Sequence, residues 1–154
     1  MVFQSVNTQY MVAIFITTMF AVFSIGFTLG GYNAAGIVAE IKMSWSHSYT
    51  ILITSSGVLG MMIGSLTADR FIVYGRYRAA FIANMIIIVS TLPQMWLSVL
   101  PLCIGRFMLG FGSGLFTVIA GIYMAETVPA DKLSLYGTSI NTGIVVGLLV
   151  TNLV

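Results

Sequence analysis

Residues that do chemistry in enzymes are scarce in this sequence, and their spacing does not build a catalytic centre. The chain has one histidine, one cysteine and four acidic residues among 154. Ser113 stands between two glycines, a setting that suggests an intramembrane serine protease, but that chemistry needs a histidine base within hydrogen-bond reach. His47 lies in the polar segment 44–48, which we expect to be a loop. We therefore predict no catalytic residue, no metal cluster and no cofactor, and so not an enzyme.

Charged side chains are also too few to cover a water-facing surface. They make up 6% of the sequence, while 58% is hydrophobic, and the mean hydropathy is +1.04. A soluble domain carries about a quarter charged residues. The net charge of +2 is too small to indicate a nucleic-acid partner. The composition predicts a multi-pass integral membrane protein whose first partner is the lipid bilayer, and it does not distinguish a plasma membrane from an organelle membrane.

Long gaps between the charged residues predict five transmembrane helices. Each gap can hold the roughly 20 apolar residues that cross a hydrocarbon core of about 30 Å. We expect one all-α bundle over residues 1–154, with spans at approximately 10–37, 49–68, 79–97, 102–125 and 135–154. Pro93 is expected to kink or stop the third span, and Pro129 to end the fourth.

The basic residues predict how this bundle is oriented. Most of them fall in the expected loops after the second and fourth spans: Arg70, Arg76, Arg78 and Lys132. Lys42 and Arg106 lie toward the opposite face. Because cytoplasmic loops are enriched in Lys and Arg, we expect the first group, and with it the N-terminus, to be cytoplasmic.

Small and polar residues within the spans indicate where helices touch. Glycines four residues apart recur in four spans: Gly26 and Gly30, Gly60 and Gly64, Gly110 and Gly114, Gly143 and Gly147. This spacing lets two backbones approach closely in lipid. The run 54–56 is expected to bond to carbonyls of its own helix, and Asn84 is expected to contact another helix.

Several motifs, in order, resemble the sugar porter family of the major facilitator superfamily. The strongest lies at 105–114, GRFMLGFGSG, followed by IYMAETVP at 122–129. Gly31-Tyr32-Asn33, the end of a signature loop at 75–78 (GRYR), and the segment 137–148 add to the match. The resemblance implies structural roles for this set: Gly31, Tyr32, Asn33, Arg106, Gly110, Gly114, Tyr123 and Pro129. It covers nearly the whole chain and implies an N-terminal part of a facilitative glucose transporter-like protein.

The resemblance also implies a gating network of charges at the cytoplasmic helix ends, which closes one state of the transporter. The residues at similar positions are Asp69, Arg70, Gly75, Arg76, Arg78 and Glu126. A carboxylate at the end of an apolar helix needs a basic partner, which supports the assignment of Glu126. The signature loop departs from the family because four residues, 71–74, separate Asp69-Arg70 from Gly75.

A sugar-binding position follows from the same resemblance. Asn141 aligns with a glutamine of the fifth helix that hydrogen-bonds sugar hydroxyls, and Ile144 would form an apolar wall of the site. An amide offers both a donor and an acceptor, which suits a hydroxyl-rich ligand. A hydrogen bond between helices is the alternative role for Asn141.

Two functions are consistent with this sequence. The first is the N-terminal part of a sugar porter that moves a hexose or polyol by alternating access. Five helices lack the sixth of a transporter half, so we expect other helices or subunits to complete the bundle. The second is a truncated, transporter-like structural subunit of a larger membrane complex, in an organelle or elsewhere, without transport activity.

Overall fold

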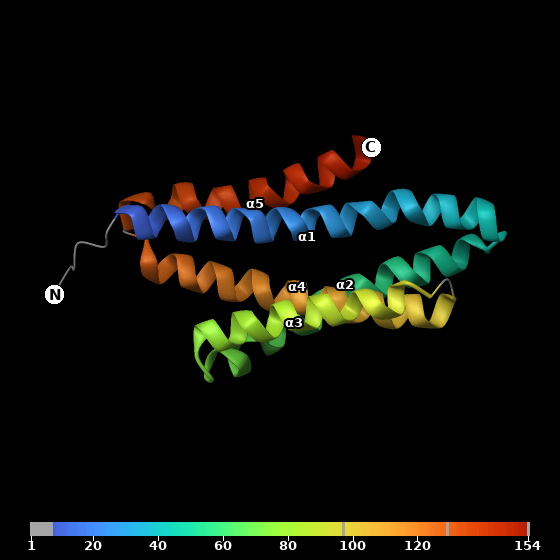
Figure 1. The fold of residues 1–154 in the computed structure, drawn as a ribbon, viewed down its shortest axis with the longest axis horizontal. Coiled ribbons are helices and arrows are strands. Elements are labelled where there is room, and N and C mark those ends of the chain that lie inside the picture. The colour runs from blue at the N-terminus through green and yellow to red at the C-terminus, as the bar shows by residue number, and fades with distance from the viewer. Residues whose placement is uncertain (1–7, 97, 129, 154) are drawn as a thin grey trace. The chain divides into compact units, whose positions relative to one another are not determined.

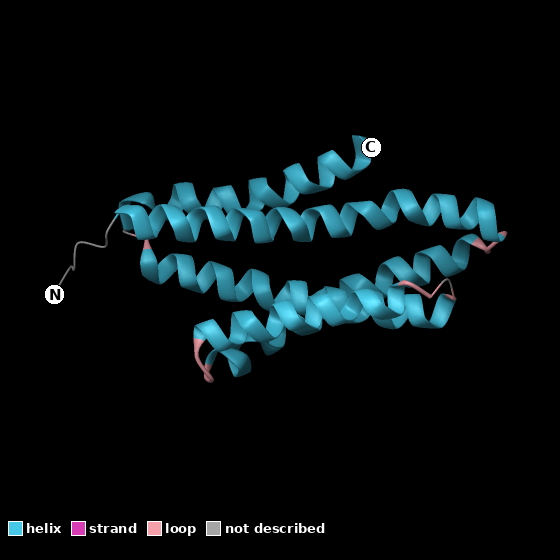
Figure 2. Cartoon of the chain, in the orientation of Figure 1, coloured by secondary structure: helices cyan, strands magenta, loops and turns pink. Residues whose placement is uncertain are grey.

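The structure, a computed structural model, describes residues 8–96, 98–128 and 130–153, and these are helical apart from short turns. Within these ranges it forms five α-helices (Figures 1 and 2). They are α1 (Thr8–Met43), α2 (His47–Ile72), α3 (Arg76–Gln94), α4 (Val99–Thr127) and α5 (Ala130–Leu153). The prediction of an all-α membrane protein with five helices is confirmed.

The helices overlap the five predicted spans but mostly run beyond them. α1 continues to Met43, and α2 includes Asp69 and Arg70 in its last turns. Arg76 and Arg78, expected in a loop, form the first turn of α3. Charged residues end a membrane crossing, but a helix continues into water wherever its backbone hydrogen bonds can still form. α3 ends at Gln94, one residue after Pro93, in agreement with the expectation that Pro93 kinks or stops this span.

Two of these helices, α2 and residues 99–126 of α4, are long and apolar enough to cross a membrane. In the described part of the chain, α1 and α5 contain shorter apolar segments at Thr18–Tyr32 and Gly137–Leu153. Large apolar side chains are exposed along α2, among them Val58 at 64% and Leu66 at 74%. Such a surface suits lipid or other helices rather than water.

The chain divides into two compact units. Unit 1 combines Met1–Gly31 with Gly121–Val154, and unit 2 is Tyr32–Ala120. Both α1 and α4 are therefore divided: one part of each helix belongs to unit 1 and the other part to unit 2. The expectation that residues 1–154 form one bundle stays a prediction.

In unit 2, α2 and α4 pack backbone against backbone. A Cβ atom added to Gly60 would meet the carbonyl group of Phe107, and one added to Gly64 would meet that of Phe111. In the reverse direction, a Cβ on Gly110 would meet the carbonyl group of Gly57. A Cβ on Gly114 would likewise meet Met61. The predicted glycine contacts of these two helices are confirmed, and they interlock.

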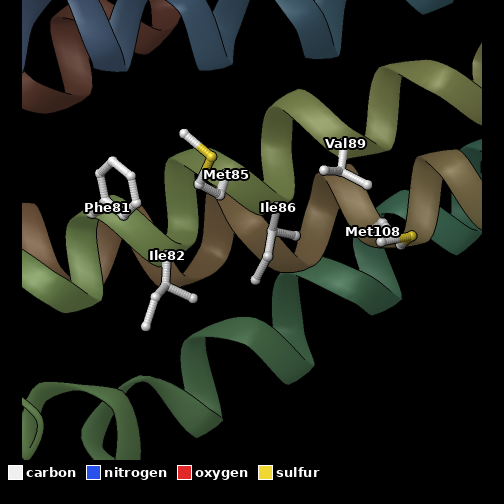
Figure 3. Close-up of a pocket in the computed structure, with 6 residues that line it drawn as sticks. All are labelled: Phe81, Ile82, Met85, Ile86, Val89 and Met108. Carbon is white, nitrogen blue, oxygen red and sulfur yellow. The ribbon is translucent and has the colours of Figure 1, made fainter.

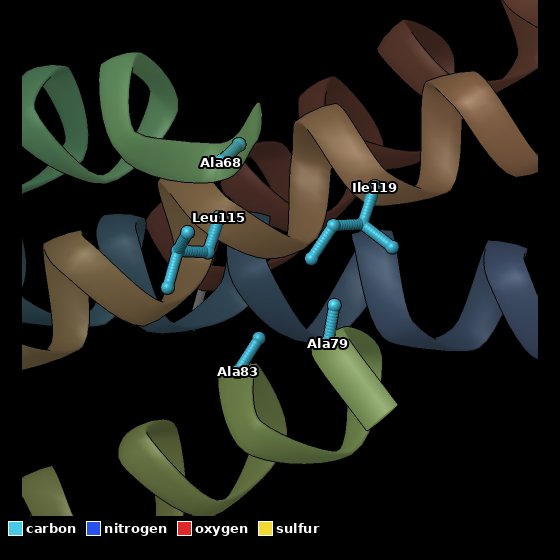
Figure 4. Close-up of a cluster of buried hydrophobic side chains, with 5 residues drawn as sticks. All are labelled: Ala68, Ala79, Ala83, Leu115 and Ile119. Atoms are coloured by element: carbon cyan, nitrogen blue, oxygen red, sulfur yellow. The ribbon is translucent and has the colours of Figure 1, made fainter. Parts of the chain in front are cut away.

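A second face of α4 holds α3. The core here consists of small side chains against larger ones: Ala68, Ala79, Ala83, Leu115 and Ile119 are all buried. Figure 4 shows Ala79 and Ala83 of α3 pointing toward Leu115 and Ile119 of α4. Gly105 and Gly112 of α4 allow this approach, because added Cβ atoms would lie 3.1 Å from the carbonyl oxygens of Ser90 and Ala83, respectively.

In unit 1, glycines likewise let the backbones of α1 and α5 approach each other closely. Added Cβ atoms on Gly26 and Gly147 would meet the backbones of Ile144 and Phe23. Thr151 donates a hydrogen bond of 3.2 Å to the carbonyl oxygen of Phe27, across the two helices. Val22, Met124, Val128 and Ile140 form the buried apolar core of the unit.

A matched pair of glycine substitutions tests the α2–α4 contact. We expect Gly110→Ala to lower the free energy of unfolding in detergent by about 1–3 kcal/mol, since the new methyl group must push α2 away. Gly121→Ala is the control, because nothing lies within 4 Å of an added Cβ there. That variant should be neutral or more stable by at most about 1 kcal/mol. Equal stability of the two variants would contradict the interlocking contact.

Candidate functional site

Arg106 is a buried charged residue of unit 2. Its residue is 7% exposed, and it lies in α4 just beyond Gly105, where that helix packs closely against α3. The Cζ atom of Arg106 lies 3.8 Å from the centre of the Tyr32 ring of α1. A guanidinium over an aromatic face is attracted by the ring quadrupole, and the attraction strengthens when water is excluded.

This stacking brings together two sequence motifs that lie far apart in the chain, residues 31–33 and 105–114. Tyr32 and Arg106 are 74 residues apart and were both assigned structural roles, but nothing in either motif indicates that they meet. A planar guanidinium stacks on a ring in a way that a lysine ammonium does not. The arrangement ties the second part of α1 to α4 and keeps a fixed positive charge between the helices of unit 2.

A polar cluster lies where α1 ends and α2 begins. Glu40 Oε2 is 3.3 Å from His47 Nδ1, and it accepts a hydrogen bond of 3.4 Å from Thr50 Oγ1. His47 is largely exposed and is the first residue of α2, so the loop expected over residues 44–48 ends at Ser46. Its contact with Glu40 was not expected from the sequence. The signal available was only a pair of ionisable residues seven positions apart, on either side of a short turn.

Five of the six residues predicted for gating lie in or next to the turn between α2 and α3. Asp69 and Arg70 are exposed near the end of α2, and Arg76 and Arg78 are exposed at the start of α3. Gly75 links them with a φ of +104°, a conformation that residues with a Cβ atom rarely adopt. This requirement gives a structural reason for glycine at position 75.

The remaining motif residues are placed as follows. Glu126 and Tyr123 are exposed near the end of α4, in unit 1. A Cβ atom on Gly31 would lie 3.3 Å from the Thr151 side chain, so Gly31 lies against α5. The side chain of Asn33 and the whole of Pro129 lie outside the described residues. The gating role of the set stays a prediction.

The predicted sugar-binding residues both lie on α5 in unit 1, but in different environments. Asn141 is on the exposed face of the helix. Ile144 is partly buried against the core of Val22, Met124, Val128 and Ile140. Its backbone is also the surface that Gly26 approaches. The exposed amide of Asn141 is available to a ligand, whereas part of the surface of Ile144 packs against α1.

Other polar side chains inside the helices mostly bond to their own backbone. Ser113 is 1% exposed and donates to the carbonyl oxygen of Gly110 at 2.8 Å. Ser56 donates to the carbonyl oxygen of Ile53, as predicted, but also reaches that of Cys103 on α4 at 3.2 Å. The expected contact of Asn84 with another helix is wrong. Its amide donates to the carbonyl oxygen of Ala80 at 3.0 Å, because residue 84 is on an exposed face of α3.

Known proteins with similar sequences identify the family of this chain. The sequence profile described as "Sugar (and other) transporter" matches residues 14–154. The chain is 32% identical over 131 residues to "Solute carrier family 2, facilitated glucose transporter member 3" of Gallus gallus, covering 82% of this chain and 26% of that protein. It is 32% identical over 97 residues to "Hexose transporter 1" of Plasmodium vivax, covering 62% and 19% of the two chains.

The apolar helices and their glycine contacts define an all-α membrane protein, and the sequence match assigns it to the transporter class. The chain belongs to the sugar porter family of the major facilitator superfamily, as the match over residues 14–154 shows. It spans about a quarter of the length of the two facilitated glucose transporters of Gallus gallus that it matches.

Substitutions at Tyr32 test the stacking on Arg106. We expect Tyr32→Leu to lower the free energy of unfolding by about 1–2 kcal/mol more than Tyr32→Phe, because phenylalanine keeps a ring face for the cation. Unfolding in mixed micelles provides the measurement. A double-mutant cycle with Arg106→Met should give a coupling of similar size. Identical losses in the Leu and Phe variants would show that the ring is not held by the charge.

Proposed function

We propose that this chain forms the N-terminal helical part of a hexose transporter that works by alternating access. The observation that carries the proposal is the family match over residues 14–154. The relatives are named as facilitated glucose transporters and hexose transporters. In this superfamily the substrate binds between two six-helix halves, so the five helices act together with further helices supplied by a longer product or by partners.

The proposed solute contact is the amide of Asn141. This side chain is on the exposed face of α5 and can both donate to and accept from sugar hydroxyl groups. The neighbouring positions on that face, Val145 and Leu149, are exposed and apolar. Amide groups among exposed apolar side chains, with no charged residue beside them, suit a neutral, hydroxyl-rich ligand better than an ion.

The proposed mode of transport is facilitated diffusion gated at the cytoplasmic side. The sequence has no acidic residue before Glu40, so α1 offers no carboxylate near Asn33 to carry a proton. Asp69, Arg70, Arg76 and Arg78 at the α2–α3 turn, with Glu126 at the end of α4, are proposed to hold the closed state by charge pairing. Gly75 shapes the turn that presents four of these charges.

Uptake by reconstituted vesicles tests the proposal. The purified product of the gene, with any partners that copurify, should exchange labelled D-glucose or another D-hexose much faster than its L-enantiomer. A protonophore should leave the rate unchanged. Uptake no faster than in protein-free vesicles, with the chain held in a larger assembly, would instead support the structural-subunit role.

Asn141 substitutions test the solute contact. We expect Asn141→Ala to raise KM for the hexose about fivefold, the effect of losing one hydrogen bond of about 1 kcal/mol. Asn141→Gln, which keeps the amide, should change KM less. Asn152→Ala is the matched control, since Asn152 is an exposed amide on the same helix whose Nδ2 atom donates to the carbonyl oxygen of Leu148. A larger effect at Asn152 than at Asn141 would refute the assignment.

Cysteine labelling tests the orientation. In a Cys103→Ser background, Ser46→Cys marks the α1–α2 turn and Val73→Cys marks the α2–α3 turn; Val73 is 84% exposed. An impermeant maleimide applied to sealed vesicles of known orientation should reach position 46 from the non-cytoplasmic side. Position 73 should react only after permeabilisation, since basic turns stay cytoplasmic. The opposite pattern would reverse the predicted topology.

A further inference from the structure

The outer face of α3 carries an apolar groove in unit 2. Its volume is about 240 Å³, and its lining is Phe81, Ile82, Met85, Ile86, Val89 and Met108. Figure 3 shows five of these side chains along α3 and Met108 contributed by α4. Phe81 and Val89 are 54% and 47% exposed, so the groove is open to its surroundings rather than filled by the rest of the unit.

One cationic residue continues the same stripe of α3. Arg78 precedes Phe81, Ile82, Met85 and Val89 by three, four, seven and eleven residues, a spacing that puts all five side chains on one helix face. Arg78 is exposed. From Arg78 to Val89 the helix rises about 16 Å, close to one leaflet of a hydrocarbon core about 30 Å thick. The stripe therefore has a positive end and an apolar body of the length of one leaflet.

The surroundings of Arg78 match the boundary between hydrocarbon and water. Tyr74 and Tyr77 beside it are 70% and 81% exposed, and tyrosine is enriched at this depth. The first turn of α3 contains arginines and no acidic residue. Because a helix N-terminus is itself electropositive, this end of α3 favours an anion. Asp69 on α2 is accompanied by Arg70, so the α2–α3 turn as a whole stays positive.

We propose that this groove binds an anionic phospholipid, with its phosphate group on Arg78 and one acyl chain along Phe81–Val89. The shape and size of the groove argue for a single chain: its volume is below that of typical drug-sized pockets, about 300–1,000 Å³, and a partner helix is about 10 Å wide. Anionic lipids are concentrated in the cytoplasmic leaflet, the side predicted for this turn. The groove belongs to unit 2, whereas the proposed solute contact belongs to α5 of unit 1.

Native mass spectrometry of the full chain tests the lipid site. The protein, purified in mild detergent, is offered equal amounts of phosphatidylserine and phosphatidylcholine with identical acyl chains. Retained phosphatidylserine should exceed retained phosphatidylcholine. Arg78→Gln should reduce phosphatidylserine retention about fivefold, the expected effect of one arginine near the membrane surface. Arg70→Gln is the control for charge, because it removes the same charge from the same turn but not from the α3 stripe.

A second pair of variants tests the groove independently of the charge. Met85→Trp fills the groove and should displace the lipid, while Ile88→Trp adds the same bulk to the same helix outside the lining and should not. Helix content by circular dichroism confirms that each variant is folded. The proposal is overturned if both lipids are retained equally, if the two arginine variants lose lipid equally, or if Ile88→Trp and Met85→Trp act alike.

Discussion

The direct contact between the backbones of α2 and α4 is the constraint on which unit 2 depends. Lipid tails are as apolar as leucine, so burying apolar side chains between helices provides little driving force in a bilayer. Close packing of the helix backbones provides the driving force for association instead. Gly57, Gly60 and Gly64 of α2 lie against the backbone of α4 around Gly110. A methyl group added to Gly60, Gly64 or Gly110 would overlap a carbonyl group of the other helix. Helices at that distance gain dispersion contacts along their whole shared length.

The other helix contacts follow from this arrangement. α4 packs against α2 through Gly110 and Gly114, which leaves Gly105 and Gly112 to receive α3. The bulky residues are displaced outward as a consequence, which is why Leu66 and Phe81 are exposed while Ala68 and Ala79 are buried. Hydroxyl groups add a few bonds between helices, such as Ser56 to Cys103 in unit 2 and Thr151 to Phe27 in unit 1. Small residues make the closest helix contacts and large ones such as Leu115 and Met124 fill the space between helices, while many other large apolar side chains face outward, which suits an apolar solvent.

Charged side chains occur in two different environments in this protein, at exposed helix ends and inside a unit. Most ionised side chains are at helix ends, where water can reach them, and the α2–α3 turn gathers four of them on exposed positions. Arg106 is the exception, since it is 7% exposed and stacks on Tyr32. A cation within an apolar bundle is costly and usually serves function. Its position in the strongest family motif agrees with that principle, and the aromatic face supplies part of the stabilisation that water would otherwise provide.

The sequence by itself determined the solvent, the number of helices and most of the small-residue contacts. These properties depend on local composition: long gaps between charges require lipid, and glycines four residues apart require a neighbouring backbone. It placed Asp69, Arg76 and Arg78 in a loop beside the predicted spans, whereas they belong to the ends of α2 and α3. It could not extend α2 and α3 through those charges, because hydropathy marks the membrane boundary and not the end of the hydrogen-bonded helix.

Only the tertiary structure decided which distant side chains meet. The stacking of Arg106 on Tyr32, the cluster of Glu40 with His47 and Thr50, and the line from Arg78 into the groove all depend on helix rotation and register. Asn84 illustrates the limit: its residue type suggested a contact with another helix, but the rotation of α3 turned it outward, where it bonds to Ala80. Rotation is set by the sum of all packing contacts around a helix, and no single position in the sequence encodes that sum.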